Sequence, residues 1–209
     1  MNIVIIAAGK GSRIYKKVKI NKQLIKINNN ILLVKLVENA IKSGFKKIFV
    51  VVGFRPNNIK KALKKFKNIT FVNNNFYKSR EMLFSIICGL KASKEDTIIS
   101  YSDIIYDHNL LNLIKKSKSK YISLPVNLNW KKIWKIRKKN IYEDAETLKY
   151  DKNLKLTDIG KKLKKTNIPK SQFMGLIYIP KKKINRIIKY YHKNNLKKMQ
   201  TTDFLNYLI

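Results

Sequence analysis

Four short segments that are apolar and rich in β-branched residues alternate with segments of helical spacing in the first part of the chain. The expected strands are residues 2–8, 47–52, 69–72 and 97–101, and the expected helices are residues 31–42, 56–66, 82–92 and 107–116. A strand that is apolar at every position is buried on both faces, which is typical of a parallel sheet covered by helices. The alternation predicts an α/β fold with three α/β/α layers and a mostly parallel, doubly wound sheet.

The pattern changes after residue 126, although no linker, repeat or low-complexity tract is present. A further strand is expected over residues 121–126, before this change. After it we expect strands over residues 147–150, 154–159 and 173–179, and helices over residues 130–138, 182–192 and 201–209. The strands 147–150 and 154–159 are expected to pair with each other. We therefore predict a single domain, residues 1–209, built from two halves, residues 1–126 and residues 127–209.

The net charge of +35 suggests a nucleic-acid partner, but its make-up argues against one. Forty-two of the 47 basic residues are Lys and five are Arg, and the Lys are spread along the whole chain. Proteins that read nucleic acids favour Arg, whose planar fork pairs with phosphate and guanine. Drift toward A- and T-rich codons explains the lysines better, and their field still attracts a triphosphate. A nucleic-acid-binding or degenerate regulatory module stays as an alternative.

The sequence also limits the compartment. The apolar run at the N-terminus ends at Ala8 and has no basic region before it, so it is too short for a signal peptide or a membrane span. The single Cys88 excludes an internal disulfide, and its apolar surroundings favour a buried structural thiol. We expect a cytoplasmic protein, with a homodimer as a possible assembly.

Two features lie where an α/β sheet binds its ligand, at the carboxyl ends of strands. The loop Gly9–Arg13 follows the first strand, and its two glycines allow close approach of the backbone to a phosphate, with Arg13 able to grip phosphate oxygens. Ser102 and Asp103 follow the fourth strand, and a carboxylate there suits Mg²⁺. The alternatives are a tight strand-to-helix turn for the loop and an N-cap or turn residue for Asp103.

These motifs resemble the nucleotidyltransferases of the GT-A-like fold, the MobA-like NTP transferase superfamily. The resemblance rests on residues 6–13 (Ile-Ala-Ala-Gly-Lys-Gly-Ser-Arg), followed by the Lys22 region, where Asn21 stands in place of the family's Pro. Residues 51–54, 77–90 and 101–104 also resemble segments of that superfamily, and residues 77–90 resemble the segment that covers the nucleobase. Residues 130–137, 144–148, 159–161, 172–176 and 201–205 resemble a narrower group, the phosphonate and phosphocholine cytidylyltransferases, in particular the 2-aminoethylphosphonate type. The resemblance spans essentially the whole chain.

The resemblance implies a role for each matching residue. Lys22 and Arg13 would be catalytic and would neutralise the α-phosphate, and Asp103 would hold Mg²⁺, the expected cofactor. The implied nucleotide-binding residues are Ala7, Ala8, Gly9, Gly11, Ser12, Arg13, Lys22, Gly53, Ser85, Ser102 and Asp103. Residues 1–126 would then be the nucleotide-binding half. A second metal-binding acid lies beyond the last helix in the resembling proteins, whereas this chain stops at Ile209, so its acceptor-binding half, residues 127–209, is expected to be short.

The acceptor-binding residues implied by the resemblance are Asp144, Glu146, Lys161 and Gln172. A cationic headgroup would need carboxylates, and Trp130 or Trp134 would add an aromatic face for it. The expected function is transfer of CMP from CTP to a small anionic phosphonate or phosphate acceptor, such as 2-aminoethylphosphonate, in phosphonate biosynthesis or in headgroup activation for a phosphonolipid or polysaccharide. The alternative within the same fold is a sugar-1-phosphate nucleotidyltransferase that uses UTP, dTTP or GTP.

Overall fold

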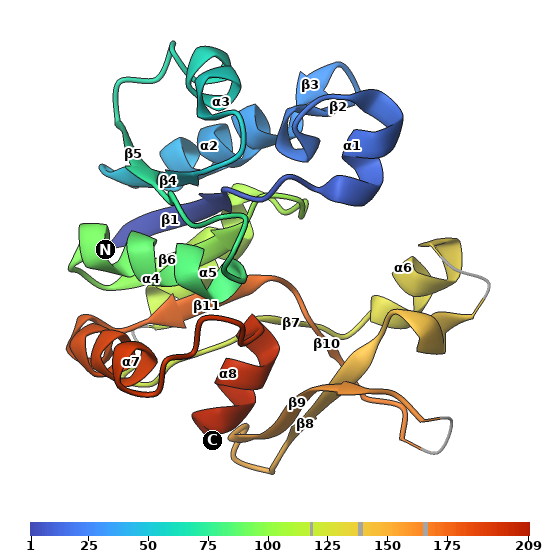
Figure 1. The fold of residues 1–209 in the computed structure, drawn as a ribbon. Coiled ribbons are helices and arrows are strands. Elements are labelled where there is room, and N and C mark those ends of the chain that lie inside the picture. The colour runs from blue at the N-terminus through green and yellow to red at the C-terminus, as the bar shows by residue number, and fades with distance from the viewer. Residues whose placement is uncertain (118, 138–139, 165–166) are drawn as a thin grey trace. The chain divides into compact units, whose positions relative to one another are not determined.

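The chain forms two compact units. The computed structural model describes residues 1–117, 119–137, 140–164 and 167–209 (Figure 1). Unit 1 comprises Met1–Ser123 and Gly175–Lys198, and unit 2 comprises Leu124–Met174 and Met199–Ile209. The chain thus passes from unit 1 to unit 2 after Ser123, close to residue 126, where the sequence pattern changes. It returns to unit 1 at Gly175, and residues 175–198 supply the fifth strand of the sheet and a long helix. The assignment of the two predicted halves to nucleotide and acceptor stays a prediction.

Unit 1 is built on a five-stranded sheet with the order β11-β6-β1-β4-β5. The strands are β1 (Asn2–Ala7), β4 (Ile48–Val52), β5 (Ile69–Asn73), β6 (Thr97–Tyr101) and β11 (Leu176–Ile179). The pairs β1–β4, β1–β6 and β4–β5 are parallel, and β11 alone runs antiparallel to its neighbour β6. Every residue of β1 and β4 is buried, because helices cover both faces. The predicted mostly parallel, doubly wound sheet is confirmed.

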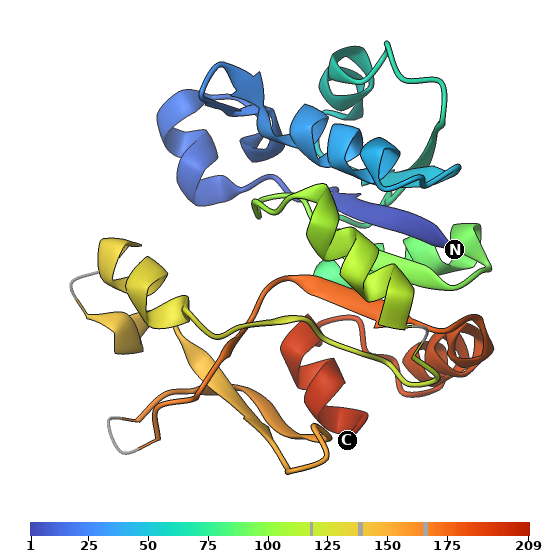
Figure 2. The ribbon, with the colours of Figure 1, turned by 180° about the vertical axis from the view of Figure 1, so that it is seen from behind.

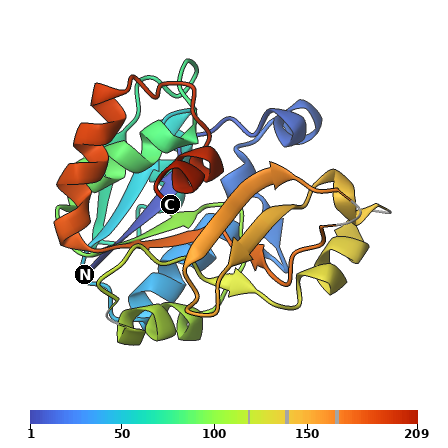
Figure 3. The ribbon, with the colours of Figure 1, turned by 90° about the horizontal axis from the view of Figure 1, so that it is seen from below.

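Helices cover the sheet of unit 1 on both faces. Helices α2 (Leu32–Lys42), α3 (Pro56–Ala62) and α5 (His108–Ser117) share one core with alternate residues of β1, and α2 and α5 are seen from this side in Figure 2. Helix α4 (Met82–Ser93) packs on the opposite face, and α7 (Lys181–Lys193) packs beside α4 (Figure 3). A Cβ on Gly89 would lie 2.3 Å from Val4 Cγ1, so only glycine lets α4 approach β1 this closely.

The ends of three helices follow the local sequence. Asp107 caps α5 as predicted, because its carboxylate accepts hydrogen bonds from the backbone N–H groups of Asn109 at 2.8 Å and Leu110 at 3.3 Å. Pro56 opens α3, and Gly44, with φ of +74°, follows the end of α2. Among the described helices, none has the length and apolar character needed to cross a membrane.

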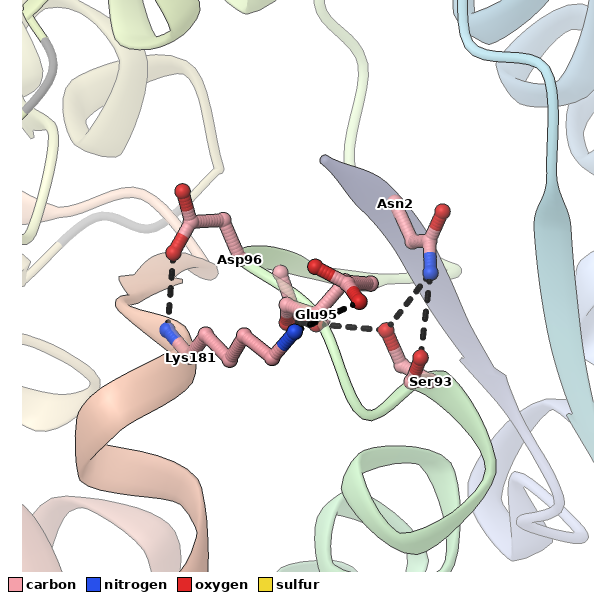
Figure 4. Close-up of polar contacts among 6 residues, drawn as sticks. Asn2, Ser93, Glu95, Asp96 and Lys181 are labelled. Atoms are coloured by element: carbon pink, nitrogen blue, oxygen red, sulfur yellow. Dashed lines mark hydrogen bonds and ion pairs between the residues drawn. The ribbon is translucent and has the colours of Figure 1, made fainter.

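A polar cluster ties the start of α7 to the sheet edge where β1 and β6 begin (Figure 4). The Asp96 carboxylate accepts a hydrogen bond from the Lys181 backbone N–H at 2.7 Å, and Lys181 Nζ pairs with Glu95 at 2.9 Å. The Asn2 amide donates to the Ser93 carbonyl at 3.2 Å and to the Ser93 hydroxyl at 3.1 Å. Asp96 therefore caps a helix that lies 85 residues away in the sequence.

Several predicted elements differ from the structure. The helix expected over residues 56–66 ends at Ala62, and the strand expected over residues 154–159 is β9 (Leu156–Lys162). The loop expected over Gly9–Arg13 ends earlier, because Ser12 is already the first residue of helix α1 (Ser12–Val18), which was not predicted. The predicted strand over residues 121–126 is wrong: Ser123 makes one isolated bridge and only β7 (Val126–Asn127) is extended in a ladder, because Pro125 has no N–H to donate. The predicted strand over residues 173–179 is interrupted at Gly175, whose φ is +77°, into β10 (Gln172–Phe173) and β11.

Unit 2 contains the hairpin of β8 (Glu146–Tyr150) and β9 (Leu156–Lys162), the pair β7–β10, helix α6 (Trp130–Arg137), the short turn η2 (Ile141–Glu143) and helix α8 (Thr201–Tyr207). The predicted pairing of two strands around residues 151–153 is confirmed. Trp130 is the centre of a small core, with 0% exposure, and its indole N–H donates to the Pro169 carbonyl at 3.1 Å. Of the two tryptophans expected to offer an aromatic face, Trp130 is therefore too deeply buried to do so.

Candidate nucleotide site

Three loops of unit 1 gather at the carboxyl ends of neighbouring strands. Residues 8–11 follow β1, residues 53–55 follow β4, and Ser102 and Asp103 follow β6. Because β6, β1 and β4 are parallel neighbours in the sheet, these loops lie at one edge. This is the edge at which doubly wound sheets bind their ligands.

Lys22 and Asp103, which are 81 residues apart in the sequence, meet at this edge. Lys22 Nζ donates to Asp103 Oδ2 at 2.7 Å. Lys22 opens the short 3₁₀ turn η1 (Lys22–Leu24), and Asp103 comes two residues after the end of β6. Their side chains are 25% and 45% exposed, so a ligand can reach both. A cation suited to phosphate oxygens and a carboxylate suited to a divalent cation thus lie side by side.

Gly11 allows the loop after β1 to lie directly against Lys22. Its φ is +63°, in the left-handed region, and a Cβ there would lie 2.8 Å from Lys22 Cδ and 2.9 Å from Lys22 Cγ. By contrast, a Cβ on Gly9 would meet no atom within 4 Å. Of the two predicted glycines, Gly11 is therefore the one that the packing around Lys22 requires.

Other predicted nucleotide-binding residues join the strand ends to one another. Ala7 and Ala8 are buried, and the Ala8 carbonyl accepts a hydrogen bond from the backbone N–H of Phe54 at 2.9 Å. A Cβ on Gly53 would lie 2.8 Å from that same carbonyl oxygen and 2.8 Å from Tyr77 Cβ, so glycine permits this close approach. The loops after β1 and β4 are consequently held against each other.

Ser85 and Ser102 are both buried and have protein partners. The Ser85 hydroxyl accepts a hydrogen bond from the Asn74 amide at 2.8 Å, which joins α4 to the end of β5. The Ser102 hydroxyl donates to the Ile6 carbonyl at 2.6 Å, which joins the end of β6 to β1. Ser12 is exposed as the first residue of α1, and the Arg13 side chain lies outside the described part of the structure.

A cluster of two cations and two aromatic rings beside the loop has no counterpart among the sequence predictions. Lys10 Nζ lies 5.1 Å from the ring centroid of Tyr15 and 5.7 Å from that of Phe54. Arg55 Cζ lies 5.2 Å and 5.5 Å from the same two centroids. Cation–π attraction therefore holds Lys10, from the predicted phosphate loop, beside Arg55 from the β4–α3 turn. Scattered aromatic residues in the sequence give no signal of such a cluster.

The carboxylate of Asp103 fits the magnesium ion that the sequence predicts. Mg²⁺ usually takes one or two protein carboxylates and keeps water and phosphate oxygens as its other ligands. Asp103 offers one accessible carboxylate at the ligand edge. Within the described residues, no group of three His, Cys, Asp or Glu side chains could enclose a metal ion. The donor set thus suits a magnesium–nucleotide complex better than a closed metal cage.

In unit 2, the predicted acceptor residues Asp144 and Glu146 belong to a local concentration of negative charge. The pKa of Glu146 is raised by partial burial and by the neighbouring carboxylates of Asp203 and Asp144. Asp203 comes from α8, so the tertiary structure adds it to the two acids that are close in sequence. A bound ammonium group would relieve the repulsion among these three carboxylates.

The other two predicted acceptor residues have partners within unit 2. Lys161 Nζ pairs with Asp158 at 2.5 Å. Burial opposes ionisation of Asp158, but hydrogen bonds from Lys161 and Thr147 outweigh it and lower the pKa of Asp158. The Gln172 amide donates to the Glu146 carbonyl at 2.5 Å. Gln172 therefore fixes the backbone that carries Glu146.

Solved structures support the fold. The inositol-1-phosphate CTP transferase of T. maritima superposes with a TM-score of 0.74 at 15% identity, covering 99% of this chain and 80% of that one. The CTP:phosphocholine cytidylyltransferase of Streptococcus pneumoniae superposes with a TM-score of 0.64 at 16% identity, covering 95% of this chain and 80% of that one. These similarities confirm the three-layer α/β fold expected from the sequence.

Sequence comparison places the chain in a family. A protein of Campylobacter jejuni named CTP:phosphoglutamine cytidylyltransferase is 30% identical over 225 residues, which cover 100% of this chain and 88% of the relative. Residues 3–152 match the MobA-like NTP transferase domain. This stretch includes the loop after β1, Lys22 and Asp103, so the resemblance inferred from the motifs is confirmed. The chain belongs to the MobA-like NTP transferase family.

Proposed function

We propose that this chain is a cytidylyltransferase that transfers CMP from CTP to a phosphonate or phosphate acceptor and releases pyrophosphate. The observation that carries the proposal is the pair of Lys22 and Asp103, 2.7 Å apart at the ligand edge of the sheet in a member of the MobA-like NTP transferase family. CTP is favoured over other nucleotides because the 30% identical relative, matched over this whole chain, is named for its use of CTP.

The proposed reaction is an in-line displacement at the α-phosphorus of CTP. An oxygen of the acceptor phosphonate or phosphate forms the new bond to this phosphorus, and the bond to the oxygen shared with the β-phosphate breaks. Pyrophosphate leaves with that electron pair. The acceptor anion is already ionised at neutral pH, so a general base is not needed. Catalysis then depends on positioning and on charge stabilisation.

Lys22 supplies the charge stabilisation that this chain offers most directly. Its Nζ would move from Asp103 to the oxygens of the α-phosphate, where negative charge develops as pyrophosphate leaves. Asp103 would hold Mg²⁺, which when bound neutralises phosphate charge. Arg13 would add a second cation, and the loop around Gly11 would supply backbone N–H groups to the phosphates.

The acids of unit 2 favour an acceptor that carries an amino group. Asp144, Glu146 and Asp203 lie close enough for their charges to raise the pKa of Glu146. An ammonium group such as that of 2-aminoethylphosphonate would be attracted there, whereas the hydroxyl groups of a sugar phosphate would gain much less. Lys161 would release Asp158 to contact the acceptor anion, and Gln172 would keep Glu146 in place.

A pyrophosphate-release assay with Mg²⁺ tests the proposal. Four nucleoside triphosphates are combined with 2-aminoethylphosphonate, phosphocholine, phosphoglutamine, inositol-1-phosphate and common sugar-1-phosphates. We expect release with CTP and an amino-bearing acceptor, and a loss of at least 100-fold in Lys22→Ala and Asp103→Asn. Lys65→Ala is the matched control, because it removes a lysine paired with an acid, Glu38, away from the strand ends.

Each result of this assay separates the alternatives. Release with UTP, dTTP or GTP and a sugar-1-phosphate would replace the proposed acceptor and nucleotide while keeping the family chemistry. Release that survives in Lys22→Ala would contradict the role given to Lys22. Tight, salt-dependent binding of random duplex DNA without any pyrophosphate release would favour the nucleic-acid-binding alternative.

A further inference from the structure

We propose that Asn21 is a positioning residue that holds Lys22 in place for the triphosphate, through a hydrogen bond to the turn after β4. The Asn21 side chain is 0% exposed, and its amide N–H donates to the Phe54 carbonyl at 2.8 Å. Phe54 lies 33 residues further along the chain. The bond therefore ties the segment before η1 to a turn that borders the candidate nucleotide site.

Gln23 provides a second tie on the other side of Lys22. Its side chain is 1% exposed, and its amide donates to the Gly9 carbonyl at 3.2 Å and to the Ala7 carbonyl at 3.4 Å. The residue before Lys22 is thus bound to the turn after β4, and the residue after it to the loop after β1. Because the side chains of both neighbours are hydrogen-bonded to separate loops, the backbone of Lys22 has little freedom to move along the edge of the sheet.

The stem of Lys22 completes this arrangement. Gly11 lies so close that a Cβ there would be 2.8 Å from Lys22 Cδ, and Lys22 Nζ reaches Asp103 at 2.7 Å. The stem of the side chain is therefore held against the loop, which limits the positions that Nζ can reach. A displacement of a reacting group by about 1 Å can lower a rate by up to about 100-fold, so this restraint matters for function.

Stability alone does not account for the amides beside Lys22. Asn21 Oδ1 and Gln23 Oε1 are both buried and have no hydrogen-bond partner within the described part of the chain. A buried acceptor without a partner destabilises the folded state, and an apolar side chain of similar size would avoid that loss. The Asn21 donor is consequently better explained by the geometry that it fixes than by the stability that it adds.

A double-mutant cycle on nucleotide binding tests the inference, which rests on the proposed use of Lys22. The dissociation constant of magnesium-bound CTP is measured by calorimetry for wild type, Asn21→Ala, Lys22→Ala and the double variant, with ATP, GTP and UTP in parallel. When Lys22 is present, we expect Asn21→Ala to raise the dissociation constant for CTP about 10-fold. When Lys22 is already replaced by alanine, the same substitution should raise it less than 2-fold, because Asn21 acts through Lys22. Effects that simply add would overturn the inference.

Two further variants separate positioning from folding. Asn21→Leu fills similar space without the N–H donor, so we expect a higher melting temperature than for Asn21→Ala but equally weak nucleotide binding. Asn39→Ala is the matched control, since the buried Asn39 amide also donates to a backbone carbonyl, that of Tyr106, without touching Lys22. It should lose stability and keep wild-type affinity. Wild-type affinity in Asn21→Leu would refute the need for the donor.

Failure of the proposed function would look different. Nucleotide binding with no pyrophosphate release from any acceptor would reject the proposed reaction, while the cycle would still decide the role of Asn21. Binding of another nucleotide in place of CTP would reject the proposed base, and the cycle would be read with that nucleotide. If no nucleotide bound at all, both the function and the positioning role would be wrong.

Discussion

Substitution of Gly11 by alanine should reduce activity far more than it reduces stability. Alanine at φ of +63° loses about 1–2 kcal/mol from the left-handed backbone alone. Its Cβ would also lie 2.8 Å from Lys22 Cδ, about 0.6 Å inside the shortest ordinary contact of 3.4 Å. The close atoms belong to the Lys22 stem rather than to its flexible end, so either the loop or Lys22 must move. We expect kcat/KM to fall by about 10- to 100-fold.

Gly44→Ala is the matched control for this experiment. Gly44 has a similar φ of +74°, but a Cβ there would meet only Lys115 Nζ, at 3.7 Å. Both variants should lose about 1–2 kcal/mol of unfolding free energy in urea from the left-handed backbone, and Gly11→Ala somewhat more because of its contact with Lys22. Pyrophosphate release under saturating and limiting CTP then gives kcat and kcat/KM. If Gly11→Ala retained the activity of Gly44→Ala, the argument that Gly11 shapes the path of Lys22 would fail.

Three other predictions concern stability. Gly89→Ala should lower the unfolding free energy measured in urea by about 1–2 kcal/mol, because the new Cβ would lie 2.3 Å from Val4 Cγ1. An unchanged midpoint of urea unfolding would show that α4 can shift to make room for the Cβ. Glu146→Gln should become more stable relative to wild type as pH rises from the unfolded-state pKa of Glu through the raised folded-state pKa of Glu146, because ionised Glu146 disfavours the folded state in this window. Thermal melts of both proteins across pH 4 to 7 test this. A constant difference in melting temperature would contradict it. Burial, partly offset by the 2.8 Å hydrogen bond to Ser100, raises the pKa of Tyr106 to about 12, so the wild type should lose stability as pH rises from 10. Tyr106→Phe should be about 1 kcal/mol less stable at neutral pH but should lack this alkaline loss of stability. Identical alkaline profiles of the two proteins in thermal melts would refute the prediction.

Several elements of the fold follow from local sequence alone. The strands β1, β4 and β6 are apolar at successive positions, and the helices α2, α4 and α5 have helical spacing of apolar residues, so each was predicted within about one residue of its observed ends. The cap at Asp107 and the opening proline of α3 were predicted for the same local reason. The motifs around Gly11, Lys22 and Asp103 were also sufficient to recognise the family.

Other elements depend on partners that are distant in sequence. The expected strand over residues 121–126 has the right composition apart from Pro125, which cannot donate to a ladder. Which of its residues pair is decided by distant partners: Ser123 bridges only Tyr178, and only Val126 belongs to a ladder. Trp130 or Trp134 was expected to offer an aromatic face to a cationic headgroup, yet Trp130 fills the core of unit 2. Composition does not tell a buried ring from an exposed one, since burial is decided by the packing of several elements.

By itself, the sequence determined the order of strands and helices, the parallel sheet, the edge at which the candidate site lies and the family, because each of these depends on short apolar patterns and one contiguous motif. Tertiary structure alone decided that Lys22 meets Asp103, that Asp203 joins Asp144 and Glu146, and that Asn21 binds the Phe54 carbonyl. These contacts join residues up to 81 positions apart. The contacts of Lys22 and Asn21 depend on crossover connections that place the ends of β1, β4 and β6 side by side, and that of Asp203 on the packing of α8 against the β8–β9 hairpin. No local pattern encodes either arrangement.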